Sequence, residues 1–246
     1  MSPSKKLDMQ EHIASPAKKQ VYVNQMFATI APRYDLVTTL LSYGQDRRWK
    51  RKLVAMTDVQ PQHNVLDLAC GTGDITLLLA KQLGSQGKAT GVDITPEMVE
   101  RARRKGLEEP RVHFETGDIC QLGYPDASFD RITVGYGVRN VPEISRLLDE
   151  VLRLLKPSGR FLSLDFGKPE SRSYRRAYLG YLSATGSILG WLLHRDPDVY
   201  RYIAESIKHY PGQNGVRKMM EEAGFVDCSF VTFLGGAIAI NRGAKP

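Results

Sequence analysis

The chain has 246 residues, of which 42% are hydrophobic and 25% are charged, as is ordinary for a folded globular protein. No apolar run approaches the roughly 20 residues needed to cross a bilayer, and the amino terminus lacks the apolar core of a secretion signal. The three cysteines are scattered, without a Cys-x-x-Cys pair. We therefore expect reduced thiols, a cytoplasmic protein and no disulfide framework.

The amino-terminal part divides into a tail and a helical region. Residues 1–16 are polar, and we expect them to be a disordered tail ahead of a single domain at 17–246. Residues 17–57 have helical periodicity, which is broken at Pro32 and again at residues 42–44.

From residue 60 onward, short apolar runs alternate with helical segments. Strands are expected at 65–69, 88–93, 112–118, 129–135 and 160–165, with helices between them at 73–83, 96–105 and 142–155. Residues 171–223 are again helical, and two late strands follow at about 226–233 and 236–242. This order predicts an α/β fold with a mostly parallel, Rossmann-like sheet, with helices added at the amino terminus and between the fifth and sixth strands.

The most informative stretch is NVLDLACGTGD at residues 64–74, an apolar strand, a glycine turn and the start of a helix. Gly71 and Gly73 flank Thr72 and allow a ligand to approach the backbone closely. A dinucleotide loop would have a third small residue, but Thr76 stands there, and no Gly-Lys-Ser/Thr phosphate loop occurs.

Acidic residues end three successive expected strands. Asp67 would repel a pyrophosphate and suits a ligand with an ammonium and a sulfonium group. Asp93 is placed to accept hydrogen bonds from ribose hydroxyls, and Asp118 from an adenine amino group. The set predicts S-adenosylmethionine (SAM), and NAD fits less well because of Asp67 and the missing glycine.

Further blocks extend the pattern beyond this loop. They lie at residues 28–35, 41–42, 49, 135–141, 155–160 and 219–225. Over about residues 20–243 the chain resembles the ubiquinone/menaquinone biosynthesis C-methyltransferases, which include demethylmenaquinone methyltransferase and are class I SAM-dependent enzymes. The blocks around Tyr34-Asp35 and Arg139-Asn140-Val141 are the part specific to that family.

The resemblance implies a seven-stranded fold, SAM as methyl donor and a prenylated quinol as acceptor. The expected cofactor residues are Asp67, Gly71, Thr72, Gly73, Asp93, Asp118, Ile119 and Gly135, the last being often Ser in the family. The chain departs from the family pattern at Val37, Thr38, Asp46, Asp165, Gly167 and Asn241. We expect these positions near the acceptor, so they leave the choice between a naphthoquinol and a benzoquinol open.

Methylation of a ring carbon requires the electron-rich quinol, and loss of a phenolic proton strengthens the nucleophile. Arg139 is expected either to stabilise the phenolate or orient a water, or to pair with an acid and shape its loop. Tyr34 and Tyr136 either hydrogen-bond a quinol hydroxyl or only line the pocket. Asp35 is either a base or the N-cap of the following helix.

Residues 171–218 carry eight Lys or Arg, three acids and seven Tyr or Trp. Such a segment suits peripheral contact with a membrane, and it equally suits a packed helical layer. A nucleic-acid methyltransferase would have an Asp/Asn-Pro-Pro-aromatic turn where residues 134–137 read VGYG, so no nucleic-acid partner is expected. The five histidines have no metal-ligand spacing. Methylation of another apolar aromatic, a non-catalytic scaffold and a homodimer stay open.

Overall fold

The computed structural model describes residues 16–246. The expected tail lies outside the described residues, apart from Pro16, which begins a helix instead.

One seven-stranded sheet forms the centre of the molecule, and its strand order is β3-β2-β1-β4-β5-β7-β6. In chain order the strands are β1 (Asn64–Leu68), β2 (Lys88–Asp93), β3 (Val112–Thr116), β4 (Phe129–Gly135), β5 (Leu155–Phe166), β6 (Val226–Phe233) and β7 (Ile238–Ala244). The first five are parallel, and β7 runs antiparallel to both β5 and β6. The predicted fold class is therefore confirmed.

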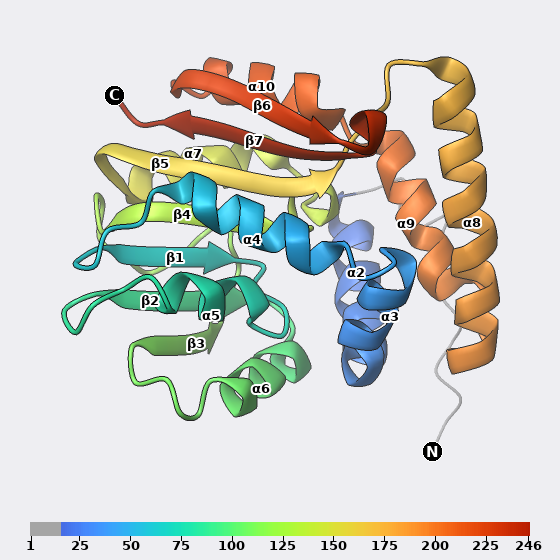
Figure 1. The fold of residues 1–246 in the computed structure, drawn as a ribbon, viewed down its shortest axis with the longest axis horizontal. Coiled ribbons are helices and arrows are strands. Elements are labelled where there is room, and N and C mark those ends of the chain that lie inside the picture. The colour runs from blue at the N-terminus through green and yellow to red at the C-terminus, as the bar shows by residue number, and fades with distance from the viewer. Residues whose placement is uncertain (1–15) are drawn as a thin grey trace.

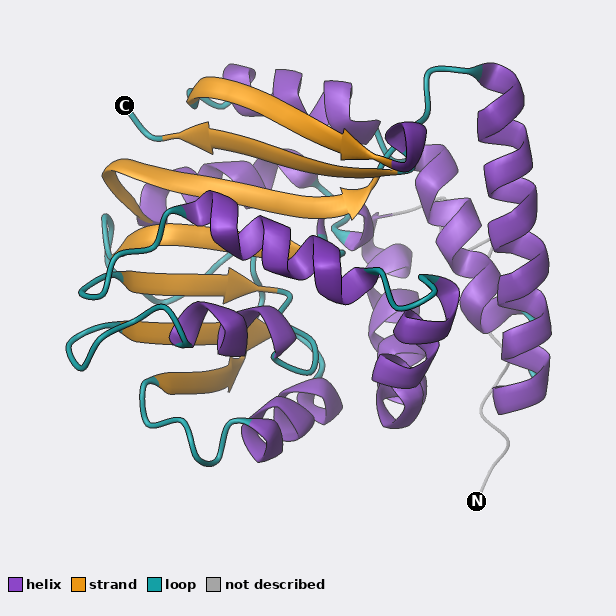
Figure 2. Cartoon of the chain, in the orientation of Figure 1, coloured by secondary structure: helices purple, strands orange, loops and turns teal. Residues whose placement is uncertain are grey.

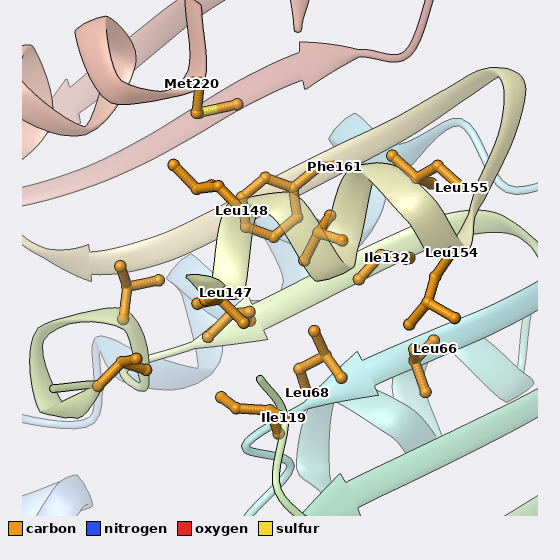
Figure 3. Packing of buried hydrophobic residues seen from close by; sticks show 14 of the residues in the cluster. Leu66, Leu68, Ile119, Ile132, Leu147, Leu148, Leu154, Leu155, Phe161 and Met220 are labelled. Atoms are coloured by element: carbon orange, nitrogen blue, oxygen red, sulfur yellow. The ribbon is translucent and has the colours of Figure 1, made fainter. Parts of the chain in front are cut away.

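Helices cover both faces of this sheet. On one side lie α4 (Asp46–Thr57) and α5 (Asp74–Ala80), and on the other α7 (Ile144–Leu154) and α10 (Gly212–Glu222), while α6 (Pro96–Lys105) packs by β2 and β3. The two-residue period of a strand explains the two cores, because Val65 packs with α4 and α5 whereas Leu66 and Leu68 pack with α7. Figure 3 shows the second core, in which Leu147 and Leu148 lie against Phe161.

The remaining helices gather beyond the carboxyl ends of the parallel strands (Figure 1). They are α2 (Pro16–Ile30), η1 (Ala31–Arg33), α3 (Tyr34–Leu41), α8 (Arg172–His194) and α9 (Asp198–His209). Figure 2 shows that helices and their connecting loops make up this end of the molecule. The expected breaks are confirmed, because Pro32 lies in η1 and the turn between α3 and α4 contains residues 42–44.

The structure corrects several boundaries. The strand expected at 112–118 ends at Thr116, so Asp118 lies just beyond it, and the helix expected at 73–83 ends at Ala80. The largest difference lies between α7 and β5. We expected a helix at 142–155, a turn at 156–159 and then a strand, but α7 ends at Leu154 and β5 begins directly at Leu155. Leu155 pairs with Phe129 and Arg160 with Arg131, and the register shifts between these pairs. Residues 156–159 therefore form an irregularity inside the strand, which pattern reading interprets as a turn.

Candidate functional site

The glycine loop connects β1 to α5 at the carboxyl edge of the sheet. Gly73 has a φ of +86°, and a Cβ atom there would lie 2.7 Å from the ring of Phe114. Only glycine allows both this backbone conformation and this close approach. At Gly135, at the end of β4, a Cβ would lie 2.2 Å from Ile75 Cδ1, the end of a flexible side chain that can move aside, so this position is less restrictive than Gly73.

A small cavity lies against this loop. Of the expected cofactor residues, it is lined by Gly71, Asp93, Asp118, Ile119 and Gly135. Among the described residues that line it, the charged ones are Asp93 and Asp118. A cavity with two carboxylates and no lining cation disfavours phosphate-bearing ligands and suits a nucleoside with a cationic tail.

Asp93 is held rigidly at this cavity. Its Oδ2 accepts a hydrogen bond from Gly71 N at 2.9 Å, and its Oδ1 accepts one from Thr95 N at 2.9 Å. A carboxylate has about four lone-pair positions, so acceptor capacity remains for ribose hydroxyls. Burial raises the pKa of Asp93, and the backbone hydrogen bonds oppose this shift.

Three expected cofactor residues, Asp67, Thr72 and Gly73, do not line the cavity. Asp67 is 1% exposed, and its two oxygens accept hydrogen bonds from Thr76 Oγ1 and Thr133 Oγ1, both at 2.7 Å. Burial raises the pKa of Asp67 to about 7. These two hydrogen bonds join β1 to α5 and to β4, and they thereby hold the glycine loop in place from the side away from the cavity.

A larger cavity of about 400 Å³ lies next to the small one. Its lining comes from α2, α3, α4, α8 and α9 and from the ends of β4, β5 and β7, and it is mostly aromatic and aliphatic. Phe27, Tyr34 and Tyr136 line both cavities. The two cavities therefore meet at these three rings, as a methyl transfer between two ligands requires.

Two residues that line the larger cavity carry buried polar atoms without a hydrogen-bond partner. The Tyr136 hydroxyl and Arg139 Nε are buried without a hydrogen-bond partner, and both residues line it. Leaving such groups unpaired costs about 1–3 kcal/mol each, so a bound oxygen atom that satisfies them would be stabilised.

Arg139 and Asp165 form a buried ion pair at the cavity wall. Arg139 Nη1 lies 2.8 Å from Asp165 Oδ1, and Arg139 N donates to Asp165 Oδ2 at 3.1 Å. The guanidinium also lies 4.8 Å from the Phe166 ring centroid. Arg139 therefore pairs with an acid, as one of the two alternatives had it, and it also lines the cavity; its action on a phenolate stays a prediction.

Asp35 lies outside both of these cavities. Its Oδ1 accepts a hydrogen bond from Thr72 Oγ1 at 2.6 Å, and its Oδ2 lies 2.6 Å from Lys105 Nζ. It is not the N-cap of α3 either, because Arg33 holds that position. Asp35 instead joins α3 to the glycine loop and to α6.

Comparison with known proteins agrees with this geometry. Residues 15–245 match the model of the ubiE/COQ5 methyltransferase family. The chain belongs to this family.

The chain is similar to a demethylmenaquinone methyltransferase of Symbiobacterium thermophilum, at 38% identity over 94% of this chain and 95% of that protein. It is 37% identical to the ubiquinone/menaquinone biosynthesis C-methyltransferase UbiE of Teredinibacter turnerae, over 93% of each chain. Its fold is similar to that of a SAM-dependent methyltransferase from Thermotoga maritima, with a TM-score of 0.66, 19% identity and coverage of 91% and 99%.

As a ubiE/COQ5 family member, the chain is a SAM-dependent methyltransferase. The donor set of the small cavity fits SAM, since bare glycine backbone and two carboxylates face a ligand that carries no phosphate.

Sequence reasoning missed a buried pair in this methyltransferase. Asp46 and Lys50 are 3% and 7% exposed, and Asp46 lines the larger cavity. The signal was present, because these charges stand four residues apart on the same face of α4 as Trp49 and Leu53, which are buried.

Some of the residues that depart from the family pattern line the larger cavity, and others lie in the surrounding structure. Val37, Thr38 and Asp46 line the larger cavity, and Asp165 reaches it through Arg139. Gly167 and Asn241 do not line it. A Cβ at Gly167 would lie 2.3 Å from Gly236 O, and Asn241 Nδ2 donates to Gln213 O at 2.8 Å.

The basic, tyrosine-rich segment 171–218 is packed over α9 and largely exposed over α8. Tyr200, Tyr202 and Tyr210 are at most 4% exposed. On α8, however, Ile188, Trp191 and Leu192 are more than half exposed. Within residues 16–246, no helix combines the length and apolarity that crossing a bilayer requires.

Proposed function

We propose that this methyltransferase transfers a methyl group from SAM to a ring carbon of a prenylated quinol, either a demethylmenaquinol or the corresponding benzoquinol. The observation that carries the proposal is the aromatic cavity of about 400 Å³, which meets the glycine-loop cavity at Phe27, Tyr34 and Tyr136. The names of the two relatives support the same class of acceptor. We further propose that residues 17–246 act as one domain, since one sheet joins both ends of the chain.

In this proposal, Gly71, Asp93, Asp118, Ile119 and Gly135 hold SAM. Asp93 accepts hydrogen bonds from the ribose hydroxyls, and Asp118 from the adenine amino group. Gly71 and Gly135 have no side chain, so SAM can approach their backbone closely, and Ile119 packs on the adenine ring. When bound, SAM supplies a methyl group activated by a sulfonium centre.

Asp67, Thr72 and Gly73 take supporting roles. Asp67 holds the loop from beneath through Thr76 and Thr133. Thr72 donates to Asp35 and accepts a hydrogen bond from Lys105 Nζ at 2.9 Å.

Arg139, Tyr136 and Tyr34 act on the acceptor. Ionising a phenol with a pKa near 10 costs about 4 kcal/mol at pH 7. The Tyr136 hydroxyl and Arg139 Nε, which are both unpartnered, offset part of this by donating to the developing oxyanion in a site shielded from water. Tyr34 stands between the cavities and aligns the ring, and reactant alignment supplies much of the remaining rate. Asp35, paired with Lys105, positions α3 and is not the base in this scheme.

The test is a panel of reduced demethyl-naphthoquinols and demethyl-benzoquinols, incubated with SAM and the purified protein. Mass spectrometry should find a gain of one methylene unit on a ring carbon of at least one quinol, together with formation of S-adenosylhomocysteine. A protein that binds SAM but methylates no quinol, while methylating a different apolar aromatic, would overturn the assignment.

We also propose that the protein works in the cytoplasm and touches an anionic membrane surface through α8 and α3. Ile188, Trp191 and Leu192 of α8 are 54–59% exposed, and Leu36 and Leu40 of α3, which packs on α8, are 53% and 48% exposed. A cation accompanies them, because Arg195, just past the end of α8, lies 5.5 Å from the Trp191 ring centroid, while Arg172, Arg175 and Arg176 lie at the other end of the helix. Apolar side chains beside cations suit a lipid headgroup region, where a prenylated acceptor resides.

A further inference from the structure

A single carboxylate stands in the wall of the larger cavity. Among the described residues that line it, the charged ones are Asp46 and Arg139, and Asp46 is 3% exposed. Burying a carboxylate destabilises the folded protein unless the carboxylate is paired and hydrogen-bonded.

Asp46 is anchored by two donors. Ser42 Oγ donates to its Oδ1 at 3.0 Å, and Lys50 Nζ donates to its Oδ2 at 3.2 Å. Lys50 is shared with Asp74, whose Oδ2 lies 2.8 Å from its Nζ. Two of about four lone-pair positions on Asp46 are therefore used, and acceptor capacity remains for a ligand.

The other polar groups of the same wall are donors. Tyr136 and Arg139 each present a buried, unpartnered N–H or O–H group. After burial, the charge of Asp46 is the next cause that raises the pKa of Tyr136, so the two groups act on the same region of the cavity. The cavity thus offers donors to one ligand oxygen and an acceptor to another.

We propose that Asp46 selects the reduced form of the acceptor. This rests on the quinol function proposed above. A quinol hydroxyl donates a hydrogen bond to the Asp46 carboxylate, whereas a quinone carbonyl has no proton and places its lone pairs against those of the carboxylate. Asp46 is therefore a specificity residue that keeps the unreactive, oxidised quinone out of the cavity.

The test measures binding by isothermal titration calorimetry with two redox-inert probes, 1-naphthol and 1-tetralone. They share a ten-carbon skeleton and carry their oxygen at the same carbon, as a hydroxyl in 1-naphthol and as a carbonyl in 1-tetralone. The second ring of 1-tetralone is also partly saturated, so the change in preference between the wild type and the variant is the quantity that reports on Asp46. A hydrogen bond to a charged group predicts that the wild type prefers 1-naphthol by about tenfold or more. In Asp46→Asn, whose amide both donates and accepts, the preference should fall to about twofold or less.

The matched control is Asp58→Asn, the same change just beyond the carboxyl end of α4, at a residue that does not line the cavity. It should keep the wild-type preference. If Asp46→Asn does not fold, Asp46→Ser removes the same charge and should lose the preference equally.

The outcomes separate the two proposals. A folded Asp46 variant that binds both probes with the wild-type preference overturns the role of Asp46 and leaves the quinol function standing. A wild type that binds neither probe shows that this cavity is not the acceptor site, and both proposals then fall.

Discussion

Arg139 forms an ion pair with Asp165 and, in our proposal, donates to the phenolate. A single substitution of Arg139 removes both interactions and cannot separate their effects. Removing one partner of a buried ion pair costs about 3–5 kcal/mol because the other charge is left unpaired, so Arg139→Ala lowers stability whatever its chemical role. Asp165, 2% exposed, is the group that would be stranded.

A double variant separates these effects. Arg139→Met with Asp165→Asn removes both charges and keeps an acceptor oxygen for the Arg139 N–H group, and we expect urea unfolding to show stability within about 2 kcal/mol of the wild type. Its turnover should nevertheless fall about 100-fold, with SAM affinity unchanged, because the donor to the phenolate is lost. Wild-type turnover in this variant would contradict the role proposed for Arg139.

Substitution of Asp93 should lower SAM affinity, in contrast to the double variant at Arg139, which should lower turnover alone. Asp93→Ala removes the proposed ribose acceptor and the bond to Gly71 N, and we expect SAM affinity measured by calorimetry to fall tenfold or more. Asp93→Asn keeps an acceptor oxygen and should lose less. Equal affinity in the wild type and Asp93→Ala would place the ribose elsewhere.

Asp67 predicts a pH dependence of stability. Its folded pKa of about 7 lies above the ordinary 3.8, so the folded protein holds this proton more tightly than the unfolded chain. The stabilisation is full below pH 3.8 and is lost as the pH rises toward 7, at up to about 1.4 kcal/mol per pH unit.

Asp67→Asn stays neutral and should therefore gain stability relative to the wild type between pH 5 and pH 8. Urea unfolding followed by circular dichroism measures the difference, with the exposed Asp126→Asn as control. Parallel stability curves for Asp67→Asn and the wild type would show that Asp67 ionises freely.

At the scale of elements, α2 and α3 form a cover over the small cavity. Val23, Phe27 and Tyr34 from these helices line it opposite the glycine loop. Two lysines fasten the cover. Lys19 Nζ donates to Arg139 O and Val141 O, both at 3.0 Å, and Lys105 Nζ lies 2.6 Å from Asp35 Oδ2.

Lys105→Ala should loosen α3 and raise the SAM dissociation rate severalfold. The expected change in the free energy of unfolding is within about 1 kcal/mol, because the pair is partly exposed. Stopped-flow fluorescence measures the rate, and Arg104→Ala, which removes the exposed neighbouring pair with Glu100, is the control. An unchanged rate in Lys105→Ala would mean that α3 does not control SAM release.

At the scale of the whole molecule, the catalytic sheet and the proposed membrane face are joined by the cavity. Tyr174, Tyr178 and Tyr181 of α8 line the cavity, while Ile188 and Trp191 of the same helix face outward. One helix would therefore carry both the lipid contact and the cavity wall, so a prenyl tail could stay in lipid while its ring reaches the site.

Co-sedimentation with vesicles of phosphatidylglycerol and phosphatidylcholine tests this arrangement. The double change Ile188→Glu and Trp191→Glu should lower binding about tenfold or more, because both apolar contact and charge attraction are weakened. Leu107→Glu, at an 80% exposed position between α6 and β3, is the control and should bind as the wild type does. Unchanged vesicle binding by the double variant would show that these α8 residues do not contact the membrane. A wild-type dimer that dissociates in the double variant would show that they form a subunit interface instead.

The sequence by itself determined the strand, turn and helix around residues 64–74 and the acids at the strand ends. The strand and helix follow from the local periodicity of apolar residues, and the turn follows from the conformational freedom of glycine. The acids come together because parallel strands end at the same edge of a sheet. The alternation of strands and helices likewise predicted the sheet, while the irregularity inside β5 was invisible because it depends on pairing with β4.

Only the tertiary structure decided which way the polar side chains face. Asp67 lies one residue before the end of β1 and Asp93 ends β2, yet Thr76 and Thr133 enclose Asp67, whereas Asp93 lines the cavity. Asp46 reaches the acceptor cavity because α4 packs across the sheet beside Tyr136. The physical reason is that helices distant in sequence meet over the strand ends, and their packing assigns each carboxylate to a ligand, to a lysine or to the core.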